Sequence, residues 1–99
     1  MNEEQSADTF MAAVARVQER SQPLLTSTGA AILIAVDLNI ATDSRGIANR
    51  LGLAHALVLR EIAGLSPRFV QVTRRDARTQ RSFLEATAEG KALAAAARI

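Results

Sequence analysis

The sequence predicts a mainly helical α+β domain in which one short β-hairpin packs against the helices. Hydrophobic residues make up 48% of the chain, yet only three residues are aromatic, so the core must be built from small aliphatic side chains, which favours helices over a β-sandwich. Residues 70–84 contain two apolar, partly alternating stretches around an arginine-rich turn, the pattern of two short strands. At 99 residues, we expect one domain with a modest core.

The first part of the chain predicts two helices of different character. Residues 7–20 place Phe10, Val14 and Val17 at i, i+4 and i+7, which gives an amphipathic helix one apolar stripe. Residues 28–38 are apolar nearly all round. A helix of that kind belongs in the middle of the core, with the first helix packed on the outside of it.

A helix, a tight turn and another helix follow. A short extended stretch at residues 39–41 leads to residues 42–44, each of which can cap the N-terminus of a third helix. Gly52 permits the left-handed turn that ends this helix. The fourth helix, residues 54–65, is closed by a serine–proline pair, because proline disfavours a helical conformation at the residue before it. After the hairpin, an alanine-rich last helix covers residues 87–98.

This order of elements is that of a winged helix-turn-helix, in which the hairpin is the wing. The predicted domain covers residues 1–99. It consists of an N-terminal helix at 7–20, a winged-helix core at 24–84 and a C-terminal helix at 87–98.

Positive charge is concentrated in one part of the chain. Residues 42–82 contain eight arginines against three acidic residues, whereas residues 1–41 contain two arginines against five acidic residues. Residues 83–99 are balanced. A positive field confined to one segment indicates a polyanionic partner such as a nucleic-acid backbone. The alternative is a solvated basic face without a ligand.

Residues 25–90 resemble the winged helix of the multiple-antibiotic-resistance regulator (MarR) family, in a short form. The order and spacing of the family's elements are kept throughout this stretch, except that about one residue is deleted after the wing. The first matching features are the apolar helix at residues 30–36 and the stretch I-A-x-x-L-G-L that begins at Ile47. In the fourth helix, Val58 and Arg60 match. The wing matches in R-R-D-x-R-x-x-R, which begins at Arg74, and the last helix in T-x-E-G, which begins at Thr87.

The resemblance implies a DNA-binding function and a role for each part. The fourth helix would enter the major groove, where Arg60 and His55 would read or position the duplex. The wing would reach into the adjacent minor groove, where the flat, weakly hydrated arginine side chain suits a region of enhanced negative potential. Asp76 is expected to be structural and to orient Arg78 by a bidentate pair. The wing residues expected to grip DNA are Arg74, Arg75, Arg78 and Arg81.

The fourth helix departs from the family, because its groove-facing positions are largely apolar here. Leu57 and Leu59 are not needed for the buried stripe of this helix. Only His55 and Arg60 can donate hydrogen bonds to base edges. Exposed leucines on a short helix favour a protein contact. The alternative function is therefore a winged-helix interaction module that binds a partner protein through this helix. A third, weaker hypothesis is an architectural protein that coats DNA without sequence preference.

The resemblance also implies a homodimer joined through the terminal helices, which spaces two reading heads about one DNA turn apart. Candidate interface residues are Phe10, Val14, Val17 and Leu93, besides Leu57 and Leu59. With no cysteine and one histidine, we expect no metal, no cofactor and no enzymatic activity. We also expect no small-molecule effector and no membrane segment, and a cytoplasmic, nucleoid-associated protein.

Overall fold

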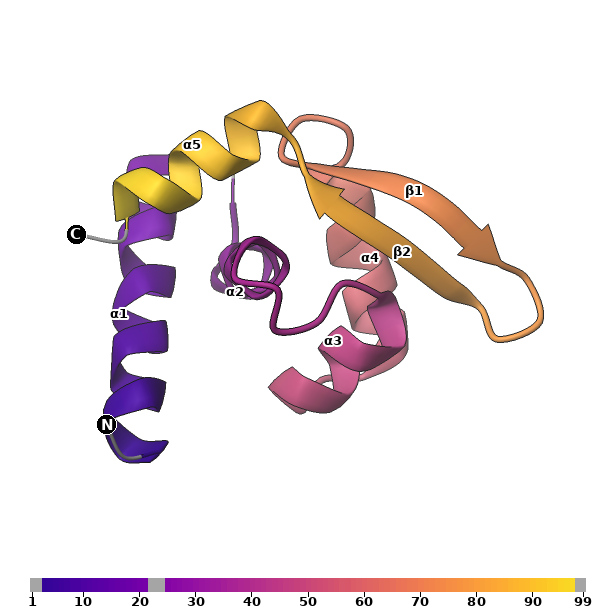
Figure 1. The fold of residues 1–99 in the computed structure, drawn as a ribbon, viewed down its shortest axis with the longest axis horizontal. Helices are drawn as coiled ribbons and strands as arrows, with labels where there is room; N and C mark the ends of the chain where they lie inside the picture. The colour runs from indigo at the N-terminus through magenta and orange to yellow at the C-terminus, as the bar shows by residue number, and fades with distance from the viewer. Residues whose placement is uncertain (1–2, 22–24, 98–99) are drawn as a thin grey trace.

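The computed structural model describes residues 3–21 and 25–97, with side chains described from residue 6 onwards. The predicted boundaries at residues 24 and 98 lie outside the described residues. Figure 1 shows the order of the elements, which are α1 (Glu3–Ser21), α2 (Ser27–Asp37), α3 (Ser44–Leu51), α4 (His55–Leu65), β1 (Val70–Asp76), β2 (Arg81–Ala86) and α5 (Ala88–Ala97). The predicted mainly helical fold with one hairpin is confirmed, and its layout is compatible with a winged helix.

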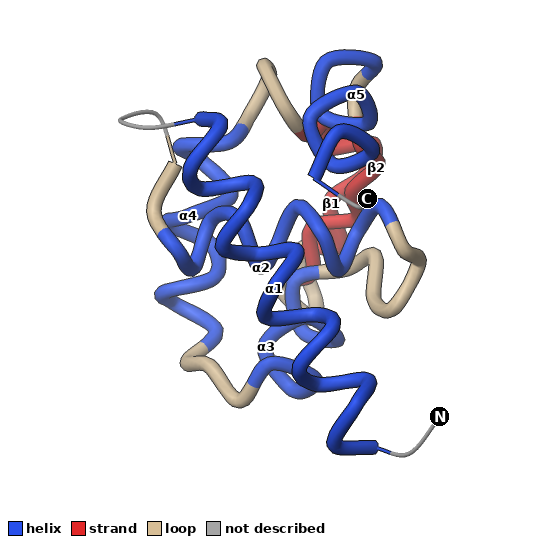
Figure 2. The backbone as a smooth tube through the Cα atoms, turned by 90° about the vertical axis from the view of Figure 1, so that its left-hand side faces the viewer, coloured by secondary structure: helices blue, strands red, loops and turns tan. Residues whose placement is uncertain are grey.

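The helix α2 forms the centre of the core, as its apolar composition predicts. Its side chains from Ile32 to Val36 are all buried, and α1, α4, α5 and β2 pack around it. Thr26 caps the helix, since its hydroxyl accepts a hydrogen bond from the backbone N–H of Gly29 at 2.9 Å. Figure 2 shows α1 lying across α2, on the side of the molecule away from the hairpin.

The two terminal helices pack against each other within one chain. Val14 and Val17 of α1 are 2% and 0% exposed, and Ala94 and Ala97 of α5 are fully buried. Arg16 adds a hydrogen bond from its guanidinium to the carbonyl of Ala97 at 3.3 Å. Val14 and Val17 therefore belong to the chain's own core, not to a dimer interface, because α2 and α5 already cover the apolar stripe of α1.

The segment from α3 to α4 has the predicted helix–turn–helix form. Asp43 is the residue that caps α3, and its carboxylate accepts from the backbone N–H of Gly46 at 3.0 Å. Gly52 ends the helix in the left-handed conformation, with φ 67° and ψ 38°. The helix α4 starts three residues later, and Val58, Ile62 and Leu65 form its buried stripe.

The hairpin consists of two antiparallel strands paired from Val70–Ala86 at the base to Asp76–Arg81 at the turn, with an irregularity between Val72 and Arg74. On its other side, β2 is bonded to the chain just before α3, because the N–H of Leu84 donates to the carbonyl of Thr42 at 2.8 Å. The extended contact thus falls at Thr42 and Asp43, later than the predicted 39–41, because Asn39 adopts a left-handed turn with φ 58°.

No helix in the described parts of the chain is both long and apolar enough to cross a membrane.

Candidate nucleic-acid interface

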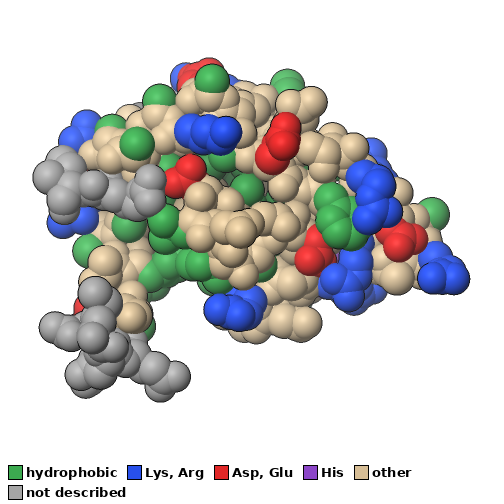
Figure 3. Space-filling model, in the orientation of Figure 1, with side chains coloured by type: hydrophobic (Ala, Val, Ile, Leu, Met, Phe, Trp, Pro, Cys, Tyr) green, Lys and Arg blue, Asp and Glu red, His purple; other side chains and the backbone are tan. Residues whose placement is uncertain are grey.

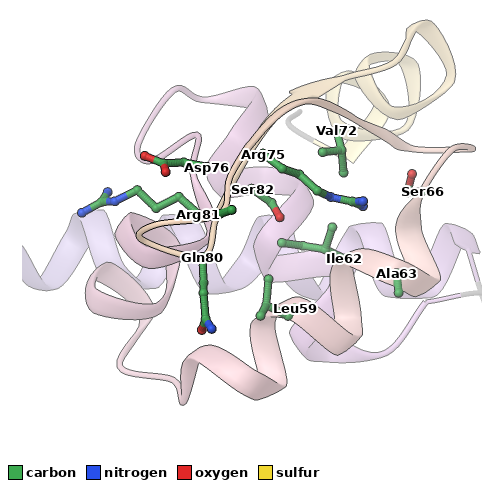
Figure 4. Close-up of a pocket in the computed structure, with 11 residues that line it drawn as sticks. Leu59, Ile62, Ala63, Ser66, Val72, Arg75, Asp76, Gln80, Arg81 and Ser82 are labelled. Atoms are coloured by element: carbon green, nitrogen blue, oxygen red, sulfur yellow. The ribbon is translucent and has the colours of Figure 1, made fainter.

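A hollow of about 730 Å³ lies between α4 and the hairpin. Figure 4 shows that apolar side chains of α4 line one side of it, while the hairpin supplies Val72 and several polar side chains on the other. The lining residues are Leu59, Ile62 and Ala63 of α4, Ser66, and Val72, Arg75, Asp76, Ala77, Gln80, Arg81 and Ser82 of the hairpin.

Two arginine contacts fix the hairpin to the N-terminus of α3. The guanidinium of Arg81 forms an ion pair with Asp43 at 2.8 Å. In the first turn of α3, Arg45 donates from Nε to the carbonyl of Thr79 at 3.1 Å. Arg81 was predicted to contact DNA, and no role was predicted for Arg45. Both side chains form a contact that holds the hairpin against α3.

Asp76 is structural, as expected, but its contact differs from the predicted one. Its Oδ1 accepts from the backbone N–H of Arg78 at 3.0 Å, which shapes the turn. The predicted bidentate pair with the Arg78 guanidinium is not formed, and the ion pair at the hairpin is that of Arg81 with Asp43. A carboxylate two residues before a turn position reaches a backbone N–H more readily than a long side chain that points to solvent.

The predicted DNA-binding arginines separate into anchored and unpaired groups. Arg74 stacks its guanidinium over the ring of Phe83, 4.0 Å from its centroid. In contrast, Arg60, Arg75 and Arg78 are exposed, and their guanidinium groups form no ion pair within the described residues. Figure 3 shows several Lys and Arg side chains at the hairpin end of the molecule, with others distributed over the helical part. Arg60 lies on α4 and Arg75 and Arg78 lie on the hairpin, the two elements between which the hollow lies.

His55 links three elements through a buried serine. Its Nε2 lies 2.9 Å from Oγ of Ser44, and the same oxygen accepts from the backbone N–H of Ser82 at 3.0 Å. Ser44 is fully buried. This junction joins the start of α4, the start of α3 and β2. His55 was predicted to contact DNA, but one of its ring nitrogens is already occupied by this internal contact.

The surroundings of His55 favour its neutral form. Burial lowers the pKa of His55 below its usual 6.5, and the nearby cations Arg45 and Arg81 lower it further, against the opposing effect of Asp43. In the neutral ring, Nε2 can accept the hydroxyl proton of Ser44, whose oxygen at the same time accepts from Ser82. The lowered pKa therefore fits the geometry of the junction.

This lowered pKa predicts that the folded protein becomes less stable as the pH falls. The unfolded chain takes up a proton at His55 more readily than the folded chain, so stability is complete above pH 6.5 and is lost as the pH falls through the folded-state pKa. His55 is the one histidine of the chain. Urea unfolding at pH 7.5 and 5.5 should show that the free energy of unfolding depends less on pH in His55→Gln than in the natural sequence. An equal dependence in both would contradict this role.

Leu57 and Leu59 are half-buried rather than exposed, which corrects the expectation drawn from the sequence. Leu59 points into the hollow beside the hairpin (Figure 4). The sequence could not show this, because whether the hairpin covers that side of α4 depends on tertiary packing. The fully solvent-facing side of α4 carries Ala56, Arg60, Ala63 and Gly64, and Arg60 is its single hydrogen-bond donor side chain.

The remaining candidate interface residues lie elsewhere. Phe10 borders a second, smaller hollow with Met11, whose side chain is 58% exposed. Leu93 is half-buried near the C-terminal end of α1. The predicted protein-contact residues therefore do not form one surface, because α1 and the hairpin lie at opposite ends of the molecule (Figure 1).

Comparison with protein-family models and with curated proteins found no match to this chain. The resemblance to the MarR family therefore rests on the motifs of the sequence and on a compatible fold. The function is inferred from the residues and their geometry.

Proposed function

We propose that this chain is a winged-helix protein that binds duplex DNA, and that it acts as a dimeric transcriptional regulator of the MarR type. The observation that carries this proposal is the set of three unpaired, exposed arginines on α4 and the hairpin, namely Arg60, Arg75 and Arg78. Exposed cations without an ion-pair partner on two neighbouring elements, beside arginines that anchor the hairpin, suit a polyanionic ligand.

In this proposal, α4 enters the major groove and the hairpin turn reaches the adjacent minor groove. The backbone strand between the two grooves then passes over the hollow, where Arg75 and Gln80 can donate to phosphate oxygens. Most of the binding free energy comes from neutralised phosphates, so affinity falls steeply with salt. The anchoring of the hairpin by Arg81 and Arg45 supports this function, since a fixed wing loses little conformational entropy on binding.

The dimer remains part of the proposal, with a smaller set of contact residues. The side chains of Val14 and Val17 are packed in the chain's own core, so a second copy would contact the more exposed part of α1 around Phe10 and Met11. Sedimentation of the natural protein and of Met11→Glu tests this surface.

A second candidate function is protein binding at the hollow, whose floor contains Leu59, Ile62 and Val72. An apolar floor between a helix and a strand can seat a partner side chain. Leu57→Ser with Leu59→Ser distinguishes the two functions. Lost partner association with unchanged DNA affinity favours protein binding, and lost DNA affinity favours the first proposal.

Replacing both Arg75 and Arg78 with alanine is expected to weaken duplex binding by about tenfold per arginine at low salt, because each loses a charge-assisted contact. The slope of log K against log salt should become shallower by roughly two units. Fluorescence anisotropy with a labelled duplex at 50 and 200 mM salt measures both quantities. Arg81 is left in place, because its replacement would also release Asp43.

A matched control removes the same charge from the opposite end of the molecule. Arg20 and Lys91 are exposed on α1 and α5, and Arg20→Ala with Lys91→Ala should leave the slope nearly unchanged. Equal losses of duplex affinity and of salt slope in the two double variants would indicate a general charge effect and would contradict a binding face at the hairpin.

A further inference from the structure

We infer that the duplex bound by this chain is selected by its A·T content and groove shape, not by a fixed order of bases. This inference rests on the proposed DNA-binding function and names the class of duplex that the same face prefers. It follows from three features of the described residues, which are the few donors on α4, its apolar outer side, and the rigid turn that presents Arg78.

The first feature is the lack of base-reading side chains on α4. Each base pair is distinguished in the major groove by hydrogen bonds, and a base-specific helix needs several donors or acceptors on its outer side. Here Arg60 is the one donor side chain on the fully exposed side, and His55 is engaged with Ser44. A single cation can contact one guanine or one phosphate, which is too little to define a sequence.

The second feature is what α4 presents in place of donors. Ala56 and Ala63 lie on the exposed side two turns apart, with Arg60 between them. In the major groove, the one base feature that rewards an apolar contact is the methyl group of thymine. Such contacts favour thymine at several positions without fixing the order of A·T and T·A pairs.

The third feature is the hairpin turn. Arg78 is exposed, and the backbone that carries it is held by Asp76, by Arg45 at Thr79 and by the ion pair of Arg81. A single arginine on a rigid turn fits a minor groove that is narrow and strongly negative, as in A-tracts. The exocyclic amino group of guanine projects into that groove, so G·C pairs obstruct the same entry.

Equilibrium competition between duplexes of equal length tests the inference with the full chain. An A·T-rich duplex should compete at least about tenfold better than a G·C-rich one, since the narrow groove and several methyl contacts, each worth about three- to fourfold, are lost together. Shuffling the order of the A·T pairs, with the A-tracts kept, should change affinity by less than about threefold. For a protein that reads a base sequence, a single mismatched base pair typically lowers the affinity by more than about threefold.

Two modified duplexes separate the grooves. Inosine in place of guanine removes the minor-groove amino group, and it should recover the part of the affinity that is lost at the minor groove, but not the part that depends on thymine methyl groups, because the paired cytosine carries none. Uracil in place of thymine removes the methyl groups, and it should weaken binding about three- to fourfold for each methyl contacted. Arg78→Ala should abolish the response to inosine and keep the response to uracil. Thermal unfolding of this variant checks that the exposed substitution leaves the fold intact.

The outcomes of these measurements distinguish failure of the inference from failure of the proposed DNA-binding function. If no duplex binds in a salt-dependent manner, the proposed function is wrong. If all compositions bind equally, DNA binding stands and the inference is overturned. If shuffling the A·T pairs with the A-tracts kept costs more than about threefold, DNA binding again stands, but the chain reads the order of the bases and the inference is overturned.

Discussion

Replacing Asp43 with alanine is expected to lower the free energy of unfolding by about 1–2 kcal/mol, because one carboxylate stabilises two elements. It caps α3 by accepting from Gly46 at 3.0 Å, and caps of this kind contribute about 1 kcal/mol. It also pairs with Arg81 at 2.8 Å, with the side chains 19% and 41% exposed, so solvent screens the pair and up to about 1 kcal/mol is expected from it.

Asp43→Asn separates the two contributions. Asparagine caps a helix about as well as aspartate, so this variant should keep the cap and lose only the ion pair, at a cost of about 1 kcal/mol or less. Urea unfolding of the three proteins measures the series. If Asp43→Ala cost no more than Asp43→Asn, the cap would contribute nothing; if Asp43→Asn cost nothing, the assignment of Asp43 as a joint between α3 and the hairpin would be wrong.

Replacing Gly90 with alanine is expected to destabilise the protein although it adds a good helix former to α5. A Cβ at Gly90 would overlap the carbonyl oxygen of Phe69, which is backbone and cannot rotate away. The helix or the strand entry must therefore shift, and because the overlap is with backbone we expect a cost of about 2–3 kcal/mol, which exceeds the gain of about 1 kcal/mol in helix propensity. For a domain of this size, each kcal/mol lowers Tm by about 4–8 °C.

Gly64→Ala is the matched control for this prediction. Gly64 also lies in a helix, but a Cβ there meets nothing within 4 Å. Alanine should raise stability at this position by about 0.5–1 kcal/mol. Calorimetry of both variants checks the pair, and a stabilised Gly90→Ala would show that α5 does not approach Phe69 as closely as described.

Much of the fold could be predicted because its signals are local. Helix periodicity, the Gly52 stop and a capping residue within 42–44 each depend on a few neighbouring positions. The hairpin was predictable for the same reason, since alternation and turn chemistry lie in one short segment. The stripe on α1 was also correctly identified, but periodicity does not reveal whether its partner is the same chain or a second copy.

The candidate site was less predictable, because its contacts join residues far apart in the chain. Asp43 and Arg81 are separated by 38 positions, as are Ser44 and Ser82. Composition marked the arginines as a group, but their division into anchored and unpaired side chains depends on where α3 meets the hairpin. The nearest local signal was the row of capping residues at 42–44, which indicated a helix start and gave no hint of a joint with His55.

The central claim is that α4 and the hairpin form the face that meets duplex DNA. The most direct test is to follow the backbone amide NMR signals of the labelled protein while an A·T-rich duplex is added. The largest shifts are expected at Arg60 and at residues 75–80, with small shifts in α1 and α5. Shifts concentrated in α1 and α5, with residues 75–80 unchanged, would contradict the claim.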